Sequence, residues 1–207
     1  MVQLKTNRDT KLIKYLEDGM IVTTSIASDL IYHTQNKKSS LNIAQRRLNI
    51  LYKSKQINRK RDSIRNSYIY YIGKSPTKID HRLKIAEFIS KLNVIGFEIK
   101  DVQLEFSELQ KTYNFRPDVV ITVVYGGRIA NFVVEVDLTK SFSNIDKYNK
   151  LITDRKNGIK TPLNSYPLII VSVCDKQIDR SRCVFRLIQV ETNLESLEAL
   201  KYPFIKS

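Results

Sequence analysis

The sequence predicts a protein of two domains that combine α-helices with β-strands, which a length of 207 residues allows. Apolar residues recur at helical spacing between Arg8 and Lys53, whereas short apolar runs typical of strands dominate after Val119. Lys74-Ser75-Pro76-Thr77 interrupts both patterns, and proline disfavours helix at the residue before it. We therefore expect an α+β domain over residues 1–75 and an α/β domain with a mixed sheet over residues 78–207.

Positive charge is concentrated in the first of these domains. The chain has 35 lysine and arginine residues against 21 acidic ones, and residues 1–77 hold 15 of the former and 5 of the latter. Residues 37–65 contain ten basic side chains and one acid, Asp62. Such a field attracts polyanions and makes their binding sensitive to salt. The alternative is a lysine-rich surface that is simply solvated.

Composition argues against a membrane, secreted or zinc protein. No apolar run approaches the roughly 18 residues of a spanning helix. The opening residues, MVQLKTNRDTKLIK, lack the apolar core of a secretory signal, so we expect a cytoplasmic protein. Two cysteines, Cys174 and Cys183, are then expected as reduced thiols. With the isolated His33 and His81 they do not form a convincing zinc site.

The first domain is predicted as three helices followed by a β-hairpin. One helix ends at Asp18-Gly19, a second begins after Thr23 or Thr24, and a third is capped by Ser39 or Ser40. The alternating aromatic and β-branched residues that follow predict a hairpin from Ile57 to Ile72 with a basic tip.

The third helix separates its side chains by chemistry. One arc holds Leu41, Ala44, Leu48 and Leu51 and must face the core. The opposite arc and its flanks carry side chains that read base edges and grip phosphates, because asparagine and glutamine bond adenine and arginine bonds guanine. We expect DNA contacts from Asn42, Gln45, Arg46, Arg47, Asn49 and Lys53 of this helix, and from Lys55, Arg59, Lys60, Arg61 and Arg65 around the hairpin.

Three helices, the third polar and basic, followed by a basic hairpin resemble the winged helix-turn-helix family. The resemblance covers about 70 residues and rests on pattern rather than on a fixed motif. It implies that the third helix enters the major groove of duplex DNA and that the hairpin, or wing, grips the adjacent backbone. A helix-turn-helix can also serve protein contacts, which remains the alternative.

The second domain is predicted from the order of its elements: a helix over 79–92, a strand over 97–106, a strand over 119–125, a tight turn at Gly126-Gly127 and a return strand over 131–138. A helix capped by Ser141 or Ser143 then runs to about Asn157. Strands follow over 168–174 and 183–190, and a helical tail over 192–201.

This αβββαβ order resembles the core of the PD-(D/E)XK nuclease superfamily, and Pro117-Asp118 and Glu135-Val136-Asp137 stand where its motif needs them. The resemblance implies Mg²⁺ held by Asp118 and Glu135, with Asp137 and a lysine as further catalytic residues. Asp137 replaces the lysine expected two positions after the glutamate, so Lys147, or else Lys140 or Lys150, would have to supply the cation; Glu87 is a further acidic candidate. Purely structural carboxylates and a metal site without catalysis are the alternatives.

The two domains together, with Lys147-Tyr148 on the later helix, resemble the replication-relaxation family of plasmids and mobile elements. The resemblance implies a protein that binds double-stranded DNA in replication, transfer or transcription control, with a degenerate nuclease-like domain used for docking or homodimerisation. The alternatives are a Mg²⁺-dependent endonuclease and a protein-interaction adaptor. The resemblance also implies a bacterial protein associated with the nucleoid or a plasmid. No membrane and no small-molecule substrate is expected.

Overall fold

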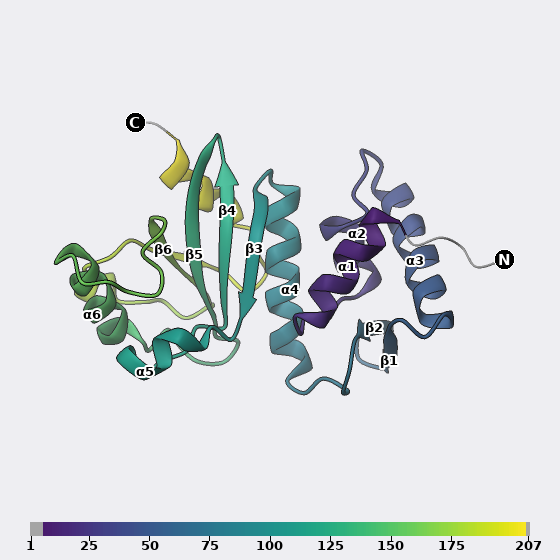
Figure 1. Cartoon of the computed structure of the whole chain (residues 1–207), viewed down its shortest axis with the longest axis horizontal. Coiled ribbons are helices and arrows are strands. Elements are labelled where there is room, and N and C mark those ends of the chain that lie inside the picture. Colours follow the sequence, from purple (N-terminus) through teal and green to yellow (C-terminus); the bar gives the residue numbers. More distant parts are fainter. Residues whose placement is uncertain (1–5, 206–207) are drawn as a thin grey trace. The chain divides into compact units, whose positions relative to one another are not determined.

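The computed structural model describes residues 6–205 and divides into two compact units, with the boundary between Val94 and Ile95. Both units are seen in Figure 1. Helices and a five-stranded mixed sheet together confirm the predicted combination of α and β structure. No helix among residues 6–205 is both long enough and apolar enough to cross a bilayer.

The first unit follows the predicted order of three helices and a hairpin. Its elements are α1 (Asn7–Glu17), α2 (Thr24–Leu30), α3 (Lys37–Lys53), β1 (Asn58–Asp62), β2 (Ser67–Tyr71) and α4 (Ile79–Val94). Thr23 caps α2, as one of the two predicted choices. The prediction of a serine cap for α3 is wrong, because Asn36 Oδ1 accepts a hydrogen bond from the Ser39 amide at 3.1 Å and starts the helix earlier.

The hairpin is joined to the helices through the backbone. β1 and β2 pair antiparallel, and Tyr70 of β2 also exchanges two backbone hydrogen bonds with Val22, at 2.8 and 3.1 Å. Val22 lies between α1 and α2, so this bridge fixes the hairpin to the segment that starts α2. The core beneath consists of apolar side chains from α1, α2, α3, β2 and the connection between α1 and α2, including Leu12, Leu16, Ile21, Leu30, Leu48, Leu51 and Ile69.

Helix α4 belongs with the first unit rather than with the second domain to which the sequence analysis assigned it. It packs against α2, and Asn93 Nδ2 donates to the Asp29 carbonyl oxygen at 2.8 Å. At its other end Asp80 Oδ1 accepts a hydrogen bond from Arg65 of the hairpin loop at 2.6 Å. These contacts involve residues far earlier in the chain, which is why helical spacing alone did not reveal them.

The second unit is built on one sheet with strand order β3-β4-β5-β6-β7. Its strands are β3 (Glu98–Leu104), β4 (Val119–Tyr125), β5 (Arg128–Val136), β6 (Leu168–Val173) and β7 (Leu187–Val190). The first three pair antiparallel, and β5, β6 and β7 pair parallel. Gly126 and Gly127, both with positive φ, form the predicted two-residue turn between β4 and β5.

Helix α6 (Ile145–Lys156) connects β5 to β6 and packs together with α5 (Gln110–Tyr113) at one side of the sheet (Figure 1). The strand predicted over 183–190 is shorter than expected, since only Leu187–Val190 pair with β6. The tail forms a 3-10 helix, Leu197–Phe204, that contains Pro203. Cys174 and Cys183 are free thiols, and no disulfide joins them.

A buried ion pair connects the helices of the first unit. Asp9 of α1 is fully buried and receives hydrogen bonds from Arg47 Nε at 3.1 Å and from the Tyr32 hydroxyl at 2.7 Å. Arg47 Nη2 donates to the second carboxylate oxygen, and so does the Thr6 amide. The carboxylate therefore holds α3, the end of α2 and the start of α1 together.

These hydrogen bonds keep Asp9 ionised. Burial alone would raise the pKa of the carboxyl group, but the hydrogen bonds from Arg47, Tyr32 and Thr6 outweigh it and lower the pKa from 3.8 to about 2. A folded-state pKa below the unfolded one stabilises the protein above about pH 4. That contribution is lost as the pH falls towards 2.

We expect Asp9→Ala to lower the free energy of unfolding of the first unit by about 3–5 kcal/mol, because the Arg47 charge would be left buried without its partner. Chemical denaturation at neutral pH measures this change. Glu17→Ala, on the exposed side of the same helix, is the matched control and should change stability by less than about 0.5 kcal/mol. Equal effects of the two substitutions would contradict the role given to Asp9.

Candidate functional site

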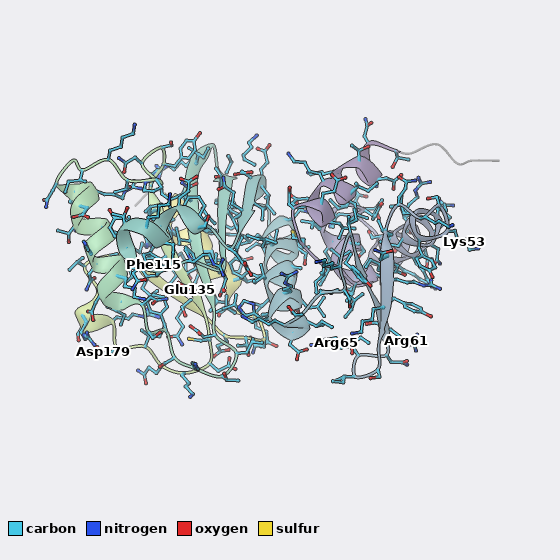
Figure 2. All side chains as sticks on the ribbon, turned by 60° about the horizontal axis from the view of Figure 1, so that its bottom comes forward. Lys53, Arg61, Arg65, Phe115, Glu135 and Asp179 are labelled. Atoms are coloured by element: carbon cyan, nitrogen blue, oxygen red, sulfur yellow. The ribbon has the colours of Figure 1, made fainter. Side chains whose placement is uncertain are left out.

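One face of α3 presents the polar side chains that the sequence analysis singled out. Asn42, Gln45, Arg46 and Lys53 are exposed, and Asn49 is half-buried beside them. Together with Ile50 they line a shallow hollow of about 390 Å³. Figure 2 labels Lys53, at the end of α3. The face offers amide and guanidinium groups in one row, which is the chemistry expected for base edges in a groove.

Arg47 does not belong to this face. Its position on the flank of α3 predicted a DNA contact, but its side chain turns inward to Asp9, and the residue is only 9% exposed. The local spacing could not decide this, because Arg47 lies next to the apolar arc and its partner is 38 residues away. Arg47 positions α3 instead of contacting a ligand.

Arg59 connects α3 to the hairpin. Its guanidinium carbon lies 4.0 Å from the centre of the Tyr52 ring of α3 and 4.2 Å from that of the Tyr68 ring of β2. Its Nη1 atom donates to Asn49 Oδ1 at 3.2 Å. A guanidinium group stacks well on aromatic faces while its edge donates hydrogen bonds. Neither tyrosine was predicted from the sequence as part of the site. Helical spacing could have found Tyr52, because it lies three residues after Asn49 on α3.

The remaining predicted contacts divide into exposed and engaged side chains. Lys55 after α3 and Lys60 and Arg61 on β1 are exposed. Arg65 in the hairpin loop instead forms ion pairs with Asp62 at 2.7 Å and Asp80 at 2.6 Å. Figure 2 shows Arg61 and Arg65 on the hairpin. The exposed positive charge of the hairpin therefore comes mainly from Lys60 and Arg61, because the two aspartates largely neutralise the charge of Arg65.

The carboxylates of the second unit gather where β4 begins and β5 ends. Val119 pairs with Val134, so Asp118 lies opposite the end of β5, and Asp118 Oδ2 accepts a hydrogen bond from the Val136 amide at 2.7 Å. Glu135, labelled in Figure 2, is 7% exposed. Side chains alternate along a strand, so Glu135 and Asp137 share a face of the sheet. The structure thus brings the three predicted carboxylates to one place.

Helix α6 covers Glu135 with two hydrogen-bond donors. The Tyr148 hydroxyl donates to Glu135 Oε1 at 3.0 Å, and Asn144 Nδ2 donates to the same atom at 3.1 Å. Tyr148 is fully buried, and its ring packs against that of Phe115 with 4.6 Å between the centroids. Neither donor was assigned this role from the sequence, because both depend on how α6 packs on the sheet.

Burial raises the pKa of Glu135 to about 8, and the charge of Asp118 adds to this effect. The hydrogen bonds from Tyr148 and Asn144 lower the pKa, but they do not offset the burial. Burial also raises the pKa of Tyr148 well above its ordinary value, so its hydroxyl keeps its proton and remains a donor. Near neutral pH the Glu135 side chain is therefore mostly a neutral acid.

The nuclease resemblance needs a lysine beside these carboxylates. Lys150 instead contacts an aromatic ring, since its Nζ atom lies 5.9 Å from the centre of the Tyr113 ring. Lys147 is half-buried and Lys140 is exposed. Glu87 lies on α4 of the first unit, where it pairs with Lys84 at 2.7 Å and Lys91 at 3.9 Å.

The three carboxylates are not arranged as a Mg²⁺ centre. Mg²⁺ is commonly held by one or two ionised carboxylates together with water in octahedral geometry, whereas Glu135 is buried and its Oε1 atom already accepts hydrogen bonds from Tyr148 and Asn144. Within residues 6–205, no three acidic, histidine or cysteine side chains form a group able to hold a metal ion. The carboxylates instead perform a structural task, since Asp118 binds the β5 backbone and Glu135 anchors α6.

We expect Glu135→Gln to remove a loss of stability at alkaline pH. A folded-state pKa above the unfolded value stabilises the protein fully below about pH 4, and this stabilisation is lost as the pH rises through 8. Glutamine keeps the oxygen that Tyr148 and Asn144 bind and carries no charge. At pH 9 the variant should be the more stable protein, by an amount on the order of a few kcal/mol.

Denaturation curves recorded between pH 5 and 9 measure this difference in the free energy of unfolding. Its pH dependence should be that of one titrating group. Glu108→Gln is the control, since this exposed side chain of the same unit should leave the pH dependence of the parent unchanged. A parent and a Glu135→Gln variant with parallel pH profiles would show that Glu135 is not buried as described.

Comparison with other proteins adds no assignment to this geometry. Neither the models of known protein families nor the curated proteins nor the solved structures provide a match. The candidate site therefore stands on the arrangement of its own residues: an exposed polar face on α3, a basic hairpin fixed to it, and a buried carboxylate cluster in the sheet unit.

Proposed function

We propose that the first unit binds duplex DNA as a winged helix, with α3 in the major groove and the β1–β2 hairpin on the adjacent backbone. The observation that carries this proposal is the exposed row of Asn42, Gln45 and Arg46 on α3. These three side chains have the donors and acceptors that distinguish base pairs in the major groove. That groove is about 12 Å wide and admits one helix.

The hairpin supplies the second half of the proposed interface. Lys60 and Arg61 are exposed on β1, and cations of this kind bind phosphates without reading sequence. Stacking of Arg59 between Tyr52 and Tyr68 fixes the hairpin against α3 before any ligand arrives. An interface held in its binding geometry loses less conformational entropy on association than a mobile one.

Charge also favours a nucleic acid over a protein partner. The net charge of the chain is +14, and the excess is greatest in the segment that forms α3 and the hairpin. If the protein were an adaptor that binds another protein through the same helix, its binding would lack the steep salt dependence that counterion release causes. The two classes of partner are therefore separable by a salt titration with duplex DNA.

The wider role rests on the family resemblance alone. It assigns the protein to replication, transfer or transcription control of a plasmid or mobile element, with the second unit as a docking or dimerisation module. The endonuclease alternative is not favoured, because no group of three potential metal-ligating side chains lies among residues 6–205 and Glu135 is engaged with Tyr148 and Asn144. We therefore assign no catalytic step to the second unit.

Arg46→Ala should weaken binding to the preferred duplex and relax base preference at one position by roughly 1–3 kcal/mol, the discrimination of one good base contact. Selection from a randomised duplex pool, followed by anisotropy titration of the selected duplex, measures both effects. Arg128→Ala removes the same charge from an exposed site in the second unit and serves as control. Indistinguishable titrations for the two variants would remove the role in base recognition from α3.

Lys60→Ala should weaken binding to all duplexes by a similar factor, because a phosphate contact carries no sequence information. The slope of log affinity against log salt concentration should fall in magnitude by about 1. Titrations at several salt concentrations with the selected and a scrambled duplex measure this. A loss confined to the selected duplex would place Lys60 on a base edge instead of on the backbone.

A further inference from the structure

The tip of the β1–β2 hairpin carries an apolar side chain in an unusual position. Ile64 is 87% exposed, more than any other large apolar residue that the structure describes. It lies in the four-residue loop between Asp62 and Ser67, which end the paired strands. Both strands of the hairpin are rich in cationic or aromatic residues, so the isoleucine stands alone at the end of a basic projection.

The loop is built to hold this side chain outward. Asp62 Oδ1 accepts hydrogen bonds from the Ile64 amide at 3.0 Å and the Arg65 amide at 3.3 Å. Asn66 adopts the left-handed conformation, with φ of 49°, and its side chain receives a hydrogen bond from Arg61. An aspartate that binds the following amides and an asparagine with positive φ are typical of a defined turn. Ile64 is thus presented by an ordered loop.

A second set of contacts supports the loop from below. The Arg65 guanidinium group bridges Asp62, through Nη1 at 2.7 Å, and Asp80 of α4, through Nη2 at 2.6 Å. This bridge ties the base of the tip to a long helix of the same unit. The arginine next to Ile64 therefore serves to anchor the loop, while Arg61 and Lys60 remain exposed on the strand that leads to it.

From this arrangement we propose that Ile64 is a wedge that enters the minor groove and partly unstacks one base step, which bends the duplex. This inference rests on the proposed DNA binding. Isoleucine cannot bind a phosphate, but apolar side chains of this kind are inserted between base steps by proteins that bind the minor groove. The minor groove is about 6 Å wide, which suits a single side chain on a narrow hairpin.

The chemistry of the tip also defines which duplexes it favours. Unstacking costs least at flexible pyrimidine–purine steps such as TA, whereas A-tracts are stiff and resist it. A site with a TA step at the hairpin end should therefore bind better than one with a stiff A-tract at the same position. This preference is separate from the base reading by α3, because it depends on deformation of the duplex.

The test uses the full chain and a duplex of about 30 base pairs with fluorophores at its ends and 2-aminopurine beside a TA step. Binding of the parent should shorten the end-to-end distance, with a bend in the range of about 20–90°, and should raise 2-aminopurine fluorescence. Ile64→Ser should keep salt-sensitive binding but lose the bend and the fluorescence rise. Ile64→Leu, which keeps the apolar bulk, should retain both.

Ile159→Ser is the matched control, since it removes an exposed isoleucine from the second unit and should behave as the parent. A parent that binds a straight duplex overturns the wedge but leaves DNA binding intact, and so does an Ile64→Ser variant that bends the duplex as the parent does. A parent without salt-sensitive binding contradicts the proposed function itself, and the wedge with it.

Discussion

The inward orientation of Arg47 determines what the first unit presents to a partner. Asp9 fixes the arginine through both of its carboxylate oxygens, and the pair is buried. Consecutive residues of a helix are about 100° apart, so a helix held by Arg47 turns Arg46 to the solvent. A rotation of α3 by one residue would exchange the two arginines. The orientation of the polar face of α3 is therefore a consequence of a single buried ion pair and of the apolar arc beside it.

The same constraint extends to the hairpin. Tyr52 and Asn49 lie on α3, and they hold Arg59 of β1 against Tyr68 of β2. The position of the hairpin therefore follows from the orientation of α3. Charge alone would make this surface attractive to any polyanion. In the proposed complex, the fixed relation between α3 and the hairpin would match a duplex, where groove and backbone have a set spacing.

The local patterns in the sequence predicted the elements better than they predicted the contacts. Apolar spacing and the paired glycines identified the α3 arcs, the β4–β5 turn and the succession of strands along the chain, because each depends on neighbouring residues. The contacts of Arg47 with Asp9 and of Glu135 with Tyr148 could not be predicted in this way, because each partner lies elsewhere in the chain. The motif at Glu135 suggested a metal ligand, and only the packed structure shows that this side chain is buried and hydrogen-bonded to Tyr148.

Hydrogen exchange of the full chain, with and without duplex DNA, tests most directly whether α3 and the hairpin form the interface. The account predicts that duplex slows exchange in residues 41–53 and 58–67, and that added salt reverses this protection as counterion release requires. Protection confined to the sheet strands β3 to β7, or no protection at low salt, would contradict it.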